Sequence, residues 1–286
     1  MAAPTFSERL ARRKREWWRT SRSPVTALHR FRDLRSTRSR TDPEEVWRCC
    51  ASWQRTLLNK WNAREFAARH GCPVPELYWY GGVSSRPPFE SFPDQFVIRP
   101  VRGGGMNGVY AVSNGVDLIR GGPATVADLD RRYALTQRLR RRAPLLIEEF
   151  ARSEDGAYRL PVEFKIFTFG GAVAAVERIE RPDLRGLRSG THNNFTPEWE
   201  PMPAFLHEKR EAAGPIPPPA CLAEILHQAS VLGALTETHM RVDFFATDRG
   251  CLFNEFSSVT ANGEGFTPYA DEYFGAFWEE HIPDRV

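Results

Sequence analysis

Short runs rich in Val, Ile and Phe recur along the chain, and each is bounded by glycine or by a polar turn residue. Runs of this kind are typical of β-strands, and they span residues 95–100, 107–113, 145–150, 164–169, 172–179, 241–247 and 251–257. Two stretches between them have apolar residues at intervals of three and four, which predicts helices over 124–142 and 219–237. Hairpin-like strands that alternate with helices favour an α+β fold over a continuous parallel βα repeat.

A further helix is predicted over residues 42–69. Asp42 suits the N-cap, because its side-chain oxygen can accept a backbone N–H, and Pro43 suits the first helical position, where no N–H is needed. A glycine and two prolines soon after this range predict the end of the helix. In contrast, six prolines within residues 201–219 predict a surface loop.

The chain has 286 residues, more than the ~100–200 residues of a typical domain, so we expect one two-lobed domain or two small domains. Apolar residues make up 41% and charged residues 26%, which excludes a disordered, collagen-like or membrane-embedded chain. No window approaches the ~20 consecutive apolar residues of a membrane-spanning helix, and the first residues lack the apolar stretch of a secretory signal. We therefore expect a cytoplasmic protein.

The net charge of +3 hides a strongly basic N-terminal arm. Residues 1–40 carry twelve basic and three acidic residues, a net charge of +9, which leaves −6 for the rest of the chain. Phe6, Leu10 and Trp17 would form a narrow apolar stripe if this arm is helical. The arm could pack on its own body or on a partner subunit, lie peripherally on an anionic membrane, or bind an acidic partner, with nucleic acid the less favoured case.

Cysteine and histidine usage gives no sign of a disulfide framework or of a structural zinc site. The five cysteines are odd in number and lack CxxC spacing, so we interpret them as free thiols: Cys49, Cys50, Cys72, Cys221 and Cys251. The histidines never recur at the short spacings that zinc sites use.

The first candidate for chemistry is a glycine cluster between two predicted strands. Gly103, Gly104 and Gly105 could let the backbone close over an anion, and Arg99 and Arg102 would add positive charge there. The cluster matches neither common phosphate-binding glycine motif, so a simple hairpin turn stays an equal alternative.

The second candidate lies between residues 145 and 167. A predicted apolar strand ends in Glu148 and Glu149, and Glu163 and Lys165 share one face of the next strand because they are two residues apart. Lys165 is one of four lysines beside 35 arginines, which indicates a chemical reason for lysine at this position. The alternative is an ordinary cross-strand ion pair with a glutamate.

The third candidate is the most specific. Asp243 lies within one predicted strand and Glu255 within the next, with a turn at residues 248–250, so the two carboxylates can face each other in a hairpin. Two acids among phenylalanines are costly unless a cation sits between them, and oxygen ligands favour magnesium or manganese. Two acids on an exposed sheet face are the alternative.

Taken together, these features resemble the ATP-grasp superfamily, in particular its teichuronopeptide-synthesis (TupA-like) branch, over roughly residues 59–278. The resemblance is carried by NKWNAREF, FPDQFVIRP with the glycines after it, LLIEEF, EFKIFTFGG, NFTPEW, MRVDFF, LFNEFSSVTANGEGFTPY and YFGAFW, in this order. It implies an α+β ATP-grasp fold with the nucleotide between two α+β lobes, preceded by the basic helical arm. The implied parts are the arm (1–42), a helical and linker region (43–90), a small lid subdomain (91–150) and a large subdomain with the magnesium site (151–286).

The resemblance also implies roles for individual residues. By position, the nucleotide phosphates would be contacted by Arg99 and Lys165 and covered by the loop of Gly103, Gly104 and Gly105. The adenine pocket would be lined by Glu148, Glu149 and Phe150, and the ribose would be bound by Glu163. The metal ligands would be Asp243, Glu255 and Ser257, and Arg241 would neutralise the oxyanion of the tetrahedral intermediate. Arg99 stands where a lysine is usual, which keeps the charge but changes the donor geometry. Ser257 stands where an asparagine is usual, so Asn254 and Asn262 are alternative third metal ligands.

The implied activity is an ATP- and Mg²⁺-dependent (or Mn²⁺-dependent) carboxylate–amine ligase. Such an enzyme forms an amide or peptide bond through an acyl phosphate and releases ADP and phosphate; its substrates would be a small carboxylate and an amine, such as amino acids or a peptide. Arg178, Arg181, Arg185, Arg188 and His192 could grip an acidic substrate or form a solvated basic loop. The alternatives are a phosphotransferase acting on a hydroxyl, and a non-catalytic nucleotide-binding protein that docks through its basic arm.

Overall fold

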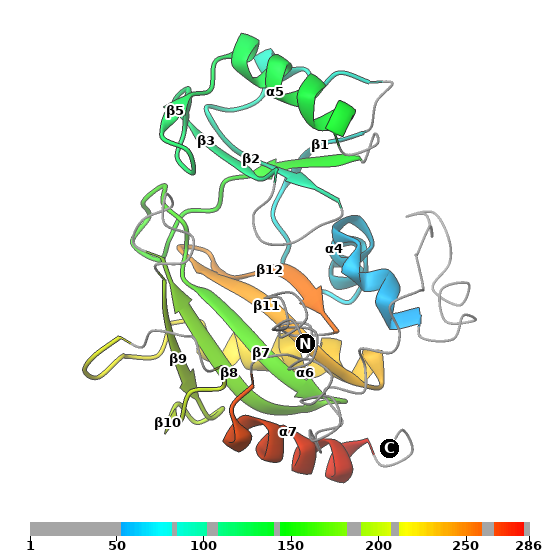
Figure 1. Cartoon of the computed structure of the whole chain (residues 1–286), viewed down its shortest axis with the longest axis vertical. Coiled ribbons are helices and arrows are strands. Elements are labelled where there is room, and N and C mark those ends of the chain that lie inside the picture. The colour runs from blue at the N-terminus through cyan, green and yellow to red at the C-terminus, as the bar shows by residue number, and fades with distance from the viewer. Residues whose placement is uncertain are drawn as a thin grey trace, which may run out of the picture.

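The computed structural model describes residues 53–81, 85–101, 108–139, 144–181, 190–206, 212–258 and 266–282. This part of the chain forms two lobes, each built on a six-stranded antiparallel sheet (Figure 1). The α+β, two-lobed architecture predicted from the sequence is confirmed. The predicted basic arm lies outside the described residues.

The small lobe has the strand order β1-β6-β2-β3-β4-β5. Its strands are β1 (Leu77–Gly81), β2 (Gln95–Pro100), β3 (Tyr110–Ser113), β4 (Val116–Asp117), β5 (Gly122–Pro123) and β6 (Leu145–Glu149). The short 3₁₀ helix η3 (Phe89–Ser91) and helix α5 (Val126–Leu139) cover one face, over Phe96 and Ile98 (Figure 1). Because side chains alternate along a strand, Val97 and Arg99 of β2 point the other way, toward the large lobe.

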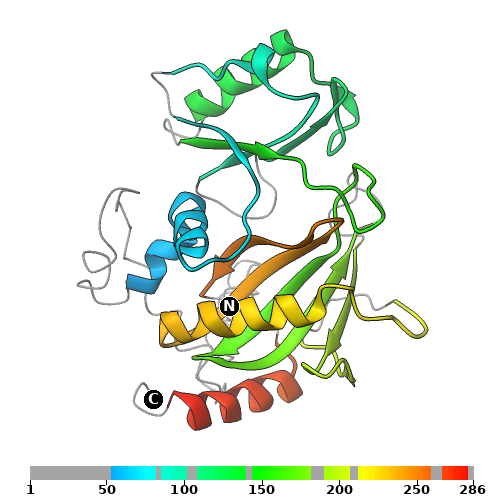
Figure 2. The same ribbon diagram turned by 180° about the vertical axis from the view of Figure 1, so that it is seen from behind.

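The large lobe has the strand order β10-β9-β8-β7-β11-β12. Its strands are β7 (Glu163–Phe169), β8 (Ala172–Glu180), β9 (Thr191–Phe195), β10 (Pro201–Met202), β11 (His239–Thr247) and β12 (Gly250–Ser257). Helix α6 (Leu222–Thr236) lies along one face and α7 (Pro268–His281) against the other (Figure 2). The 3₁₀ helix η2 (Trp53–Leu58) and helix α4 (Lys60–Arg69) contact β12 beside the junction of the lobes (Figures 1 and 2).

The two faces of the large sheet differ in chemistry. One face is apolar and packs on α6, with Phe164 and Val242 in its core. On the other face, Phe167 and Phe169 pack against α7, but Lys165 lines a cavity that small-lobe residues also line. One face of the sheet is therefore covered by α6, and part of the other face is covered by α7. The uncovered part of this second face is polar and faces the small lobe.

Most of the predicted elements are present with small changes of boundary. All seven predicted strands occur, and the two predicted helices are the shorter α5 and α6. The described part of the predicted helix 42–69 is divided into η2 and α4, because the Asn59 side chain accepts the N–H of Trp61 (3.0 Å) and starts a new helix. The predicted loop 201–219 begins with the two-residue strand β10.

Other elements were not predicted. They are β1, η3, β4, β5, β9 and α7. Cys72, Cys221 and Cys251 are free thiols, as predicted, whereas Cys49 and Cys50 lie outside the described residues. No helix within the described ranges has the length and apolarity needed to span a membrane.

Candidate active site between the lobes

A cavity of about 250 Å³ lies between the lobes. It brings together nine of the residues singled out from the sequence, namely Arg99, Glu148, Glu149, Phe150, Glu163, Lys165, Arg181, Asn254 and Glu255. Strands from both sheets supply most of them, since β2 and β6 belong to the small lobe and β7 and β12 to the large lobe. Residues from the three candidate segments, which are separate in the sequence, thus line one cavity in the fold.

A row of polar residues crosses the large sheet at this cavity. Asp243 on β11 is paired directly with Glu255 on β12 and with Lys165 on β7. Lys165 is in turn paired with Glu177 on β8. Because direct partners in a ladder project on the same face, four charged side chains lie side by side across four strands.

A β-bulge on β12 adds a further polar group to the cavity. Asp243 is paired with Glu255, but the next residue, Phe244, is paired with Phe253, so Asn254 is the extra residue. Asn254 and Glu255 therefore both line the cavity although they are adjacent in sequence. The Asn254 amide donates to Oε1 of Glu163 at 3.0 Å.

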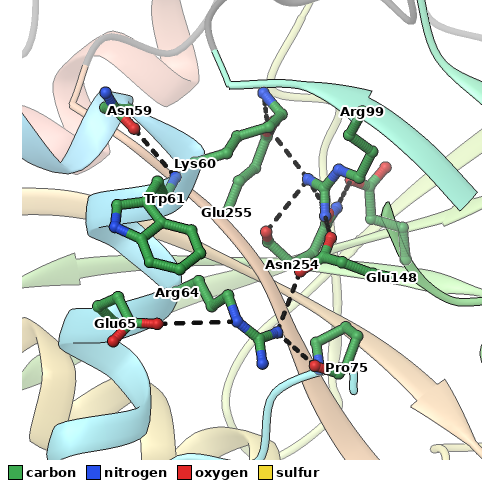
Figure 3. Close-up of polar contacts among 11 residues, drawn as sticks. Asn59, Lys60, Trp61, Arg64, Glu65, Pro75, Arg99, Glu148, Asn254 and Glu255 are labelled. Atoms are coloured by element: carbon green, nitrogen blue, oxygen red, sulfur yellow. Dashed lines mark hydrogen bonds and ion pairs between the residues drawn. The ribbon is translucent and has the colours of Figure 1, made fainter. Parts of the chain in front are cut away.

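Arg99 connects the two lobes (Figure 3). Its Nη2 donates to the Asn254 side-chain oxygen at 2.8 Å, and its Nη1 lies 3.4 Å from Oε2 of Glu148. Its Nη2 is also 4.0 Å from Glu255. A planar guanidinium suits this arrangement, because it can donate to partners on two sides at once.

Helix α4 supplies two cations that the sequence analysis did not assign to the site (Figure 3). Lys60 Nζ lies 2.9 Å from Oε2 of Glu255, and Lys60 lines the cavity. Arg64, one helical turn later, pairs with Glu148 at 3.0 Å and donates to the Pro75 carbonyl. The signal was the pair of basic residues at i and i+4 in NKWNAREF, a spacing that puts both on one helix face.

Glu163 and Lys165 differ in how they are balanced. Burial opposes ionisation of Glu163, but Lys165 and Arg181 together lower the pKa of Glu163 to about 2. Arg181 Nη1 donates to Glu163 at 2.9 Å. Lys165, in contrast, has no hydrogen bond or ion pair within the described ranges, so its ammonium group is available to an anion that enters the cavity.

Asp243 is buried and held by a two-pronged ion pair. Arg241 donates from Nε and Nη2 to the two carboxylate oxygens of Asp243, each at 2.7 Å. Burial raises the pKa of Asp243 to about 6, against the attraction of Arg241 and Lys165. Burial also opposes ionisation of Glu255, but Lys60 and Arg99 lower the pKa of its carboxyl group. Each acid therefore has an internal cation beside it.

The predicted magnesium ion needs oxygen ligands, and Asp243 and Glu255 are the acids expected to supply them. Asp243 and Glu255 offer carboxylate oxygens on one face, whereas no group of three His, Cys, Asp or Glu side chains forms a metal cage in the described part of the chain. Magnesium typically binds through one or two carboxylates and keeps waters and phosphate oxygens as its other ligands. The two carboxylates therefore fit a magnesium ion that arrives with a nucleotide.

The other predicted site residues have different positions. Ser257 is paired with Arg241 in the β11–β12 ladder. Ser257, Arg241 and Asp243 are not among the residues that line the cavity, and Arg241 and Asp243 are buried. The glycine loop Gly103, Gly104 and Gly105, together with Arg102, Arg185, Arg188 and Asn262, lies outside the described residues.

Comparisons with solved structures show the fold. D-alanine–D-alanine ligase from Bacillus anthracis, complexed with ATP, has a TM-score of 0.50 and 15% identity over 80% of this chain and 65% of that chain. D-Alanine–D-alanine ligase from Helicobacter pylori has a TM-score of 0.49 and 15% identity over 81% of this chain and 59% of that chain. The VanG D-Ala:D-Ser ligase from Enterococcus faecalis has a TM-score of 0.49 and 16% identity over 81% of this chain and 62% of that chain. The chain thus spans less than two thirds of the length of these ligases.

No protein of curated function matches the sequence. The family model described as TupA-like ATPgrasp matches residues 63–278, which is well over half of the chain and agrees with the resemblance found in the sequence. This chain is therefore a member of the TupA-like ATP-grasp family.

Proposed function

We propose that the protein is an ATP- and magnesium-dependent ligase that joins a carboxylate to an amine. The observation that carries the proposal is the cavity between the lobes, which Lys165 and Glu255 both line. Lys165 has no ion pair with any described residue, and the buried Asp243 is the direct ladder partner of both Lys165 and Glu255. A cation of this kind next to two acids is a suitable arrangement for phosphates that enter together with a metal ion. The ligases with a similar fold support the same class of reaction.

The nucleotide would lie across the cavity. Arg99, Lys60 and Lys165 would bind its phosphates, because these three cations line one cavity from both lobes and α4. Glu148, Glu149 and Phe150 would line the adenine pocket, and Glu163 would bind the ribose. Gly103, Gly104 and Gly105 would close over the phosphates, as the family resemblance implies.

Asp243 and Glu255 would hold the magnesium (or manganese) ion, with Ser257 or Asn254 as a further ligand. When bound, this ion would neutralise phosphate charge as a Lewis acid. The cations that now pair with the two acids, Arg241 and Lys60, would then be free to face anionic groups of the substrates. The internal ion pairs thus keep the buried acids balanced until a ligand arrives.

The reaction would proceed through an acyl phosphate. The substrate carboxylate attacks the γ-phosphorus of ATP, ADP leaves, and the amine then attacks the activated carbonyl carbon and displaces phosphate. Arg241 would neutralise the oxyanion of the tetrahedral intermediate. The substrates would be small molecules such as amino acids or a peptide, and the reaction would take place in the cytoplasm, with the basic arm available for a partner subunit, an acidic partner or an anionic membrane surface.

The first test is thermal unfolding with millimolar ATP or ADP and magnesium. A ligand that binds only the folded state at 100 times its dissociation constant adds ~2.7 kcal/mol, which raises the midpoint by several degrees. The parent should show this shift and Asp243→Asn should lose it. Asp130→Asn is the matched control, because Asp130 is also paired with an arginine, Arg86 at 2.7 Å, but lies on α5 and not beside the cavity residues Lys165 and Glu255, as Asp243 does.

The second test separates a ligase from a phosphotransferase. The parent is incubated with ATP, magnesium and a panel of L- and D-amino acids, and ADP release and amide formation are measured. A ligase releases ADP only when both a carboxylate and an amine are present, and it forms an amide. Absence of the thermal shift in the parent would contradict nucleotide binding, and ADP release with a phosphorylated hydroxyl product would contradict the ligase.

A further inference from the structure

The polar face of the large sheet continues past the cavity to a histidine that the roles above do not use. Glu163, which lines the cavity, is paired with Ile179 on β8, and Ile179 is paired with His192 on β9. His192 therefore projects on the same face as Glu163 and Lys165. Neighbouring strands are ~4.8 Å apart, so β9 lies ~10 Å from β7, a span that an amino-acid-sized substrate can cover.

His192 forms a close pair with Glu177. The two side chains meet at 2.6 Å between Nδ1 of His192 and Oε1 of Glu177, and Glu177 is only 4% exposed. Burial opposes ionisation of Glu177, but the hydrogen bond from His192 and the charge of Lys165 lower the pKa of this carboxyl group. An ionised carboxylate accepts the Nδ1–H, which leaves the lone pair of the ring on Nε2.

Nε2 of His192 has no hydrogen-bond partner among the described residues, and the side chain is 12% exposed. A base that is oriented by a carboxylate and has its second nitrogen open to a ligand is a recurring arrangement for proton transfer. The pair also lies on the face that carries Lys165, which we assign to the phosphate. A proton acceptor is therefore placed two strands away from the lysine at the phosphate end of the site.

We propose that His192, oriented by Glu177, is the general base that deprotonates the acceptor amine. This inference rests on the proposed ligase function and adds a subsite for an amine that arrives as an ammonium ion. The negative charge of Glu177 favours the cationic ammonium group and then stabilises the imidazolium that forms.

A primary amine arrives at the site as an ammonium ion. One proton of the ammonium group passes to Nε2 of His192, and the nitrogen lone pair forms the C–N bond to the acyl phosphate. The C–O bond to phosphate then breaks, and the second proton leaves with the phosphate. His192 finally returns its proton to water, so no oxidant or further reactant is needed.

The experiment compares two small nucleophiles on the full chain. Ammonium is charged at neutral pH and needs a base, whereas hydroxylamine is uncharged and does not. The parent, His192→Gln and Glu177→Gln are given ATP, magnesium and the panel of L- and D-amino acids as carboxylates, with either nucleophile. Primary amide and hydroxamate are measured, and the thermal shift with ADP and magnesium reports whether each variant is folded and binds nucleotide.

We expect His192→Gln to reduce amide formation from ammonium about a hundredfold, the lower end of the usual contribution of a general base, and to leave hydroxamate formation within a few-fold of the parent. Glu177→Gln should shift the ratio of the two products in the same direction. His281→Gln is the matched control, because His281 also lies near a glutamate, Glu280 at 3.9 Å, but on α7. It should not change the ratio.

Equal loss of both products, or no loss of amide, would overturn the role of His192, and so would a parent that forms hydroxamate but no amide. If the parent forms neither product with any carboxylate, the proposed function itself fails, and the inference fails with it. Should His192→Gln not fold, the product ratio of Glu177→Gln decides the question.

Discussion

The ammonium nitrogen of Lys60 lies 2.9 Å from Oε2 of Glu255, the carboxylate that we assign to the metal. Lys60 is the first residue of α4, and its backbone N–H donates to the Val101 carbonyl at 3.0 Å. Val101 directly follows β2 of the small lobe, so the backbone of Lys60 is fixed at the junction of the lobes. Its side chain therefore reaches the cavity from a position that both lobes define.

We predict that Lys60→Met weakens the binding of ADP measured without magnesium. The loss should be about tenfold in the dissociation constant, or ~1.4 kcal/mol, because one of the phosphate-binding charges is removed. Titration calorimetry without the metal separates this effect from any change in metal binding by Glu255. Lys60→Arg keeps the charge and should stay within a few-fold of the parent; equal affinities for the parent and Lys60→Met would remove Lys60 from the phosphate site.

Arg99 gives a second prediction, because it donates to Asn254 at 2.8 Å and lies 3.4 Å from Glu148. A lysine keeps the charge but cannot serve both partners as a planar fork does. Arg99→Lys should therefore keep nucleotide affinity within a few-fold but lower the free energy of unfolding by ~1–2 kcal/mol, the cost of a buried polar group left without its hydrogen bond.

Urea unfolding of the parent and Arg99→Lys measures this loss. Arg86→Lys is the control, because Arg86 also contacts two acids, Glu90 and Asp130, but its side chain is 46% exposed. Exposed ion pairs contribute little, so this variant should lose well under ~1 kcal/mol. Similar losses in the two variants would contradict the inter-lobe role of Arg99.

The hairpin that brings Asp243 and Glu255 onto neighbouring strands could be predicted from the sequence, because a turn at residues 248–250 joins two apolar runs. Their direct pairing, in contrast, depends on the bulge at Asn254, since regular alternation from the turn would pair Asp243 with Asn254. The alternation of side chains along one strand placed Glu163 and Lys165 on one face. Because strand alternation within one hairpin is a local property, the features that depend on it can be predicted from the residue pattern alone.

Other parts of the site depend on contacts that no local pattern carries. The bulge that turns Asn254 into the cavity is a property of how β12 pairs with β11, whereas in the sequence Asn254 is only an alternative metal ligand that the family resemblance implies. Lys60 reaches Glu255, which is distant in sequence, because α4 packs on β12. Strand β1 joins the edge of the small sheet beside β6, although its residues fall in the predicted linker region.

His239 leads to a prediction about pH. It is fully buried between β7 and α7, and its Nδ1 lies 3.0 Å from the Thr168 carbonyl. Burial lowers its pKa from 6.5 to about 4, so the folded state favours the neutral ring. The stabilisation is complete above the unfolded pKa of 6.5 and is lost as the pH falls from 6.5 toward 4, by an amount on the order of 3 kcal/mol.

The free energy of unfolding in urea should therefore fall more steeply between pH 6.5 and pH 4.5 in the parent than in His239→Phe, which cannot be protonated. The comparison concerns the slope, so a constant offset in stability between the two proteins does not affect it. Glu163, whose pKa is lowered to about 2, adds its own loss mainly below pH 4.5 and is present in both proteins. Parallel slopes would show that His239 is not kept neutral by the fold.

The buried pair of Arg241 and Asp243 allows a test by a double-mutant cycle. Asp243→Asn leaves the buried guanidinium of Arg241 without its carboxylate, and Arg241→Met leaves the fully buried carboxylate without its cation. Each change should lower the free energy of unfolding by ~3 kcal/mol, measured in urea without ligand at pH 8, above the pKa of Asp243 of about 6. The double variant should lose less than the sum of the two, because it removes both charges together.

A coupling free energy above ~1 kcal/mol would establish that the two side chains stabilise each other when no ligand is bound. The matched cycle on Arg86 and Asp130, an exposed pair at a similar distance of 2.7 Å, should give a smaller value, since solvent screens exposed charges. Additive losses at Arg241 and Asp243 would contradict the ion pair. With the pair established, magnesium and ADP should restore more stability to Arg241→Met than to the double variant, because only the former keeps the carboxylate that we assign to the metal.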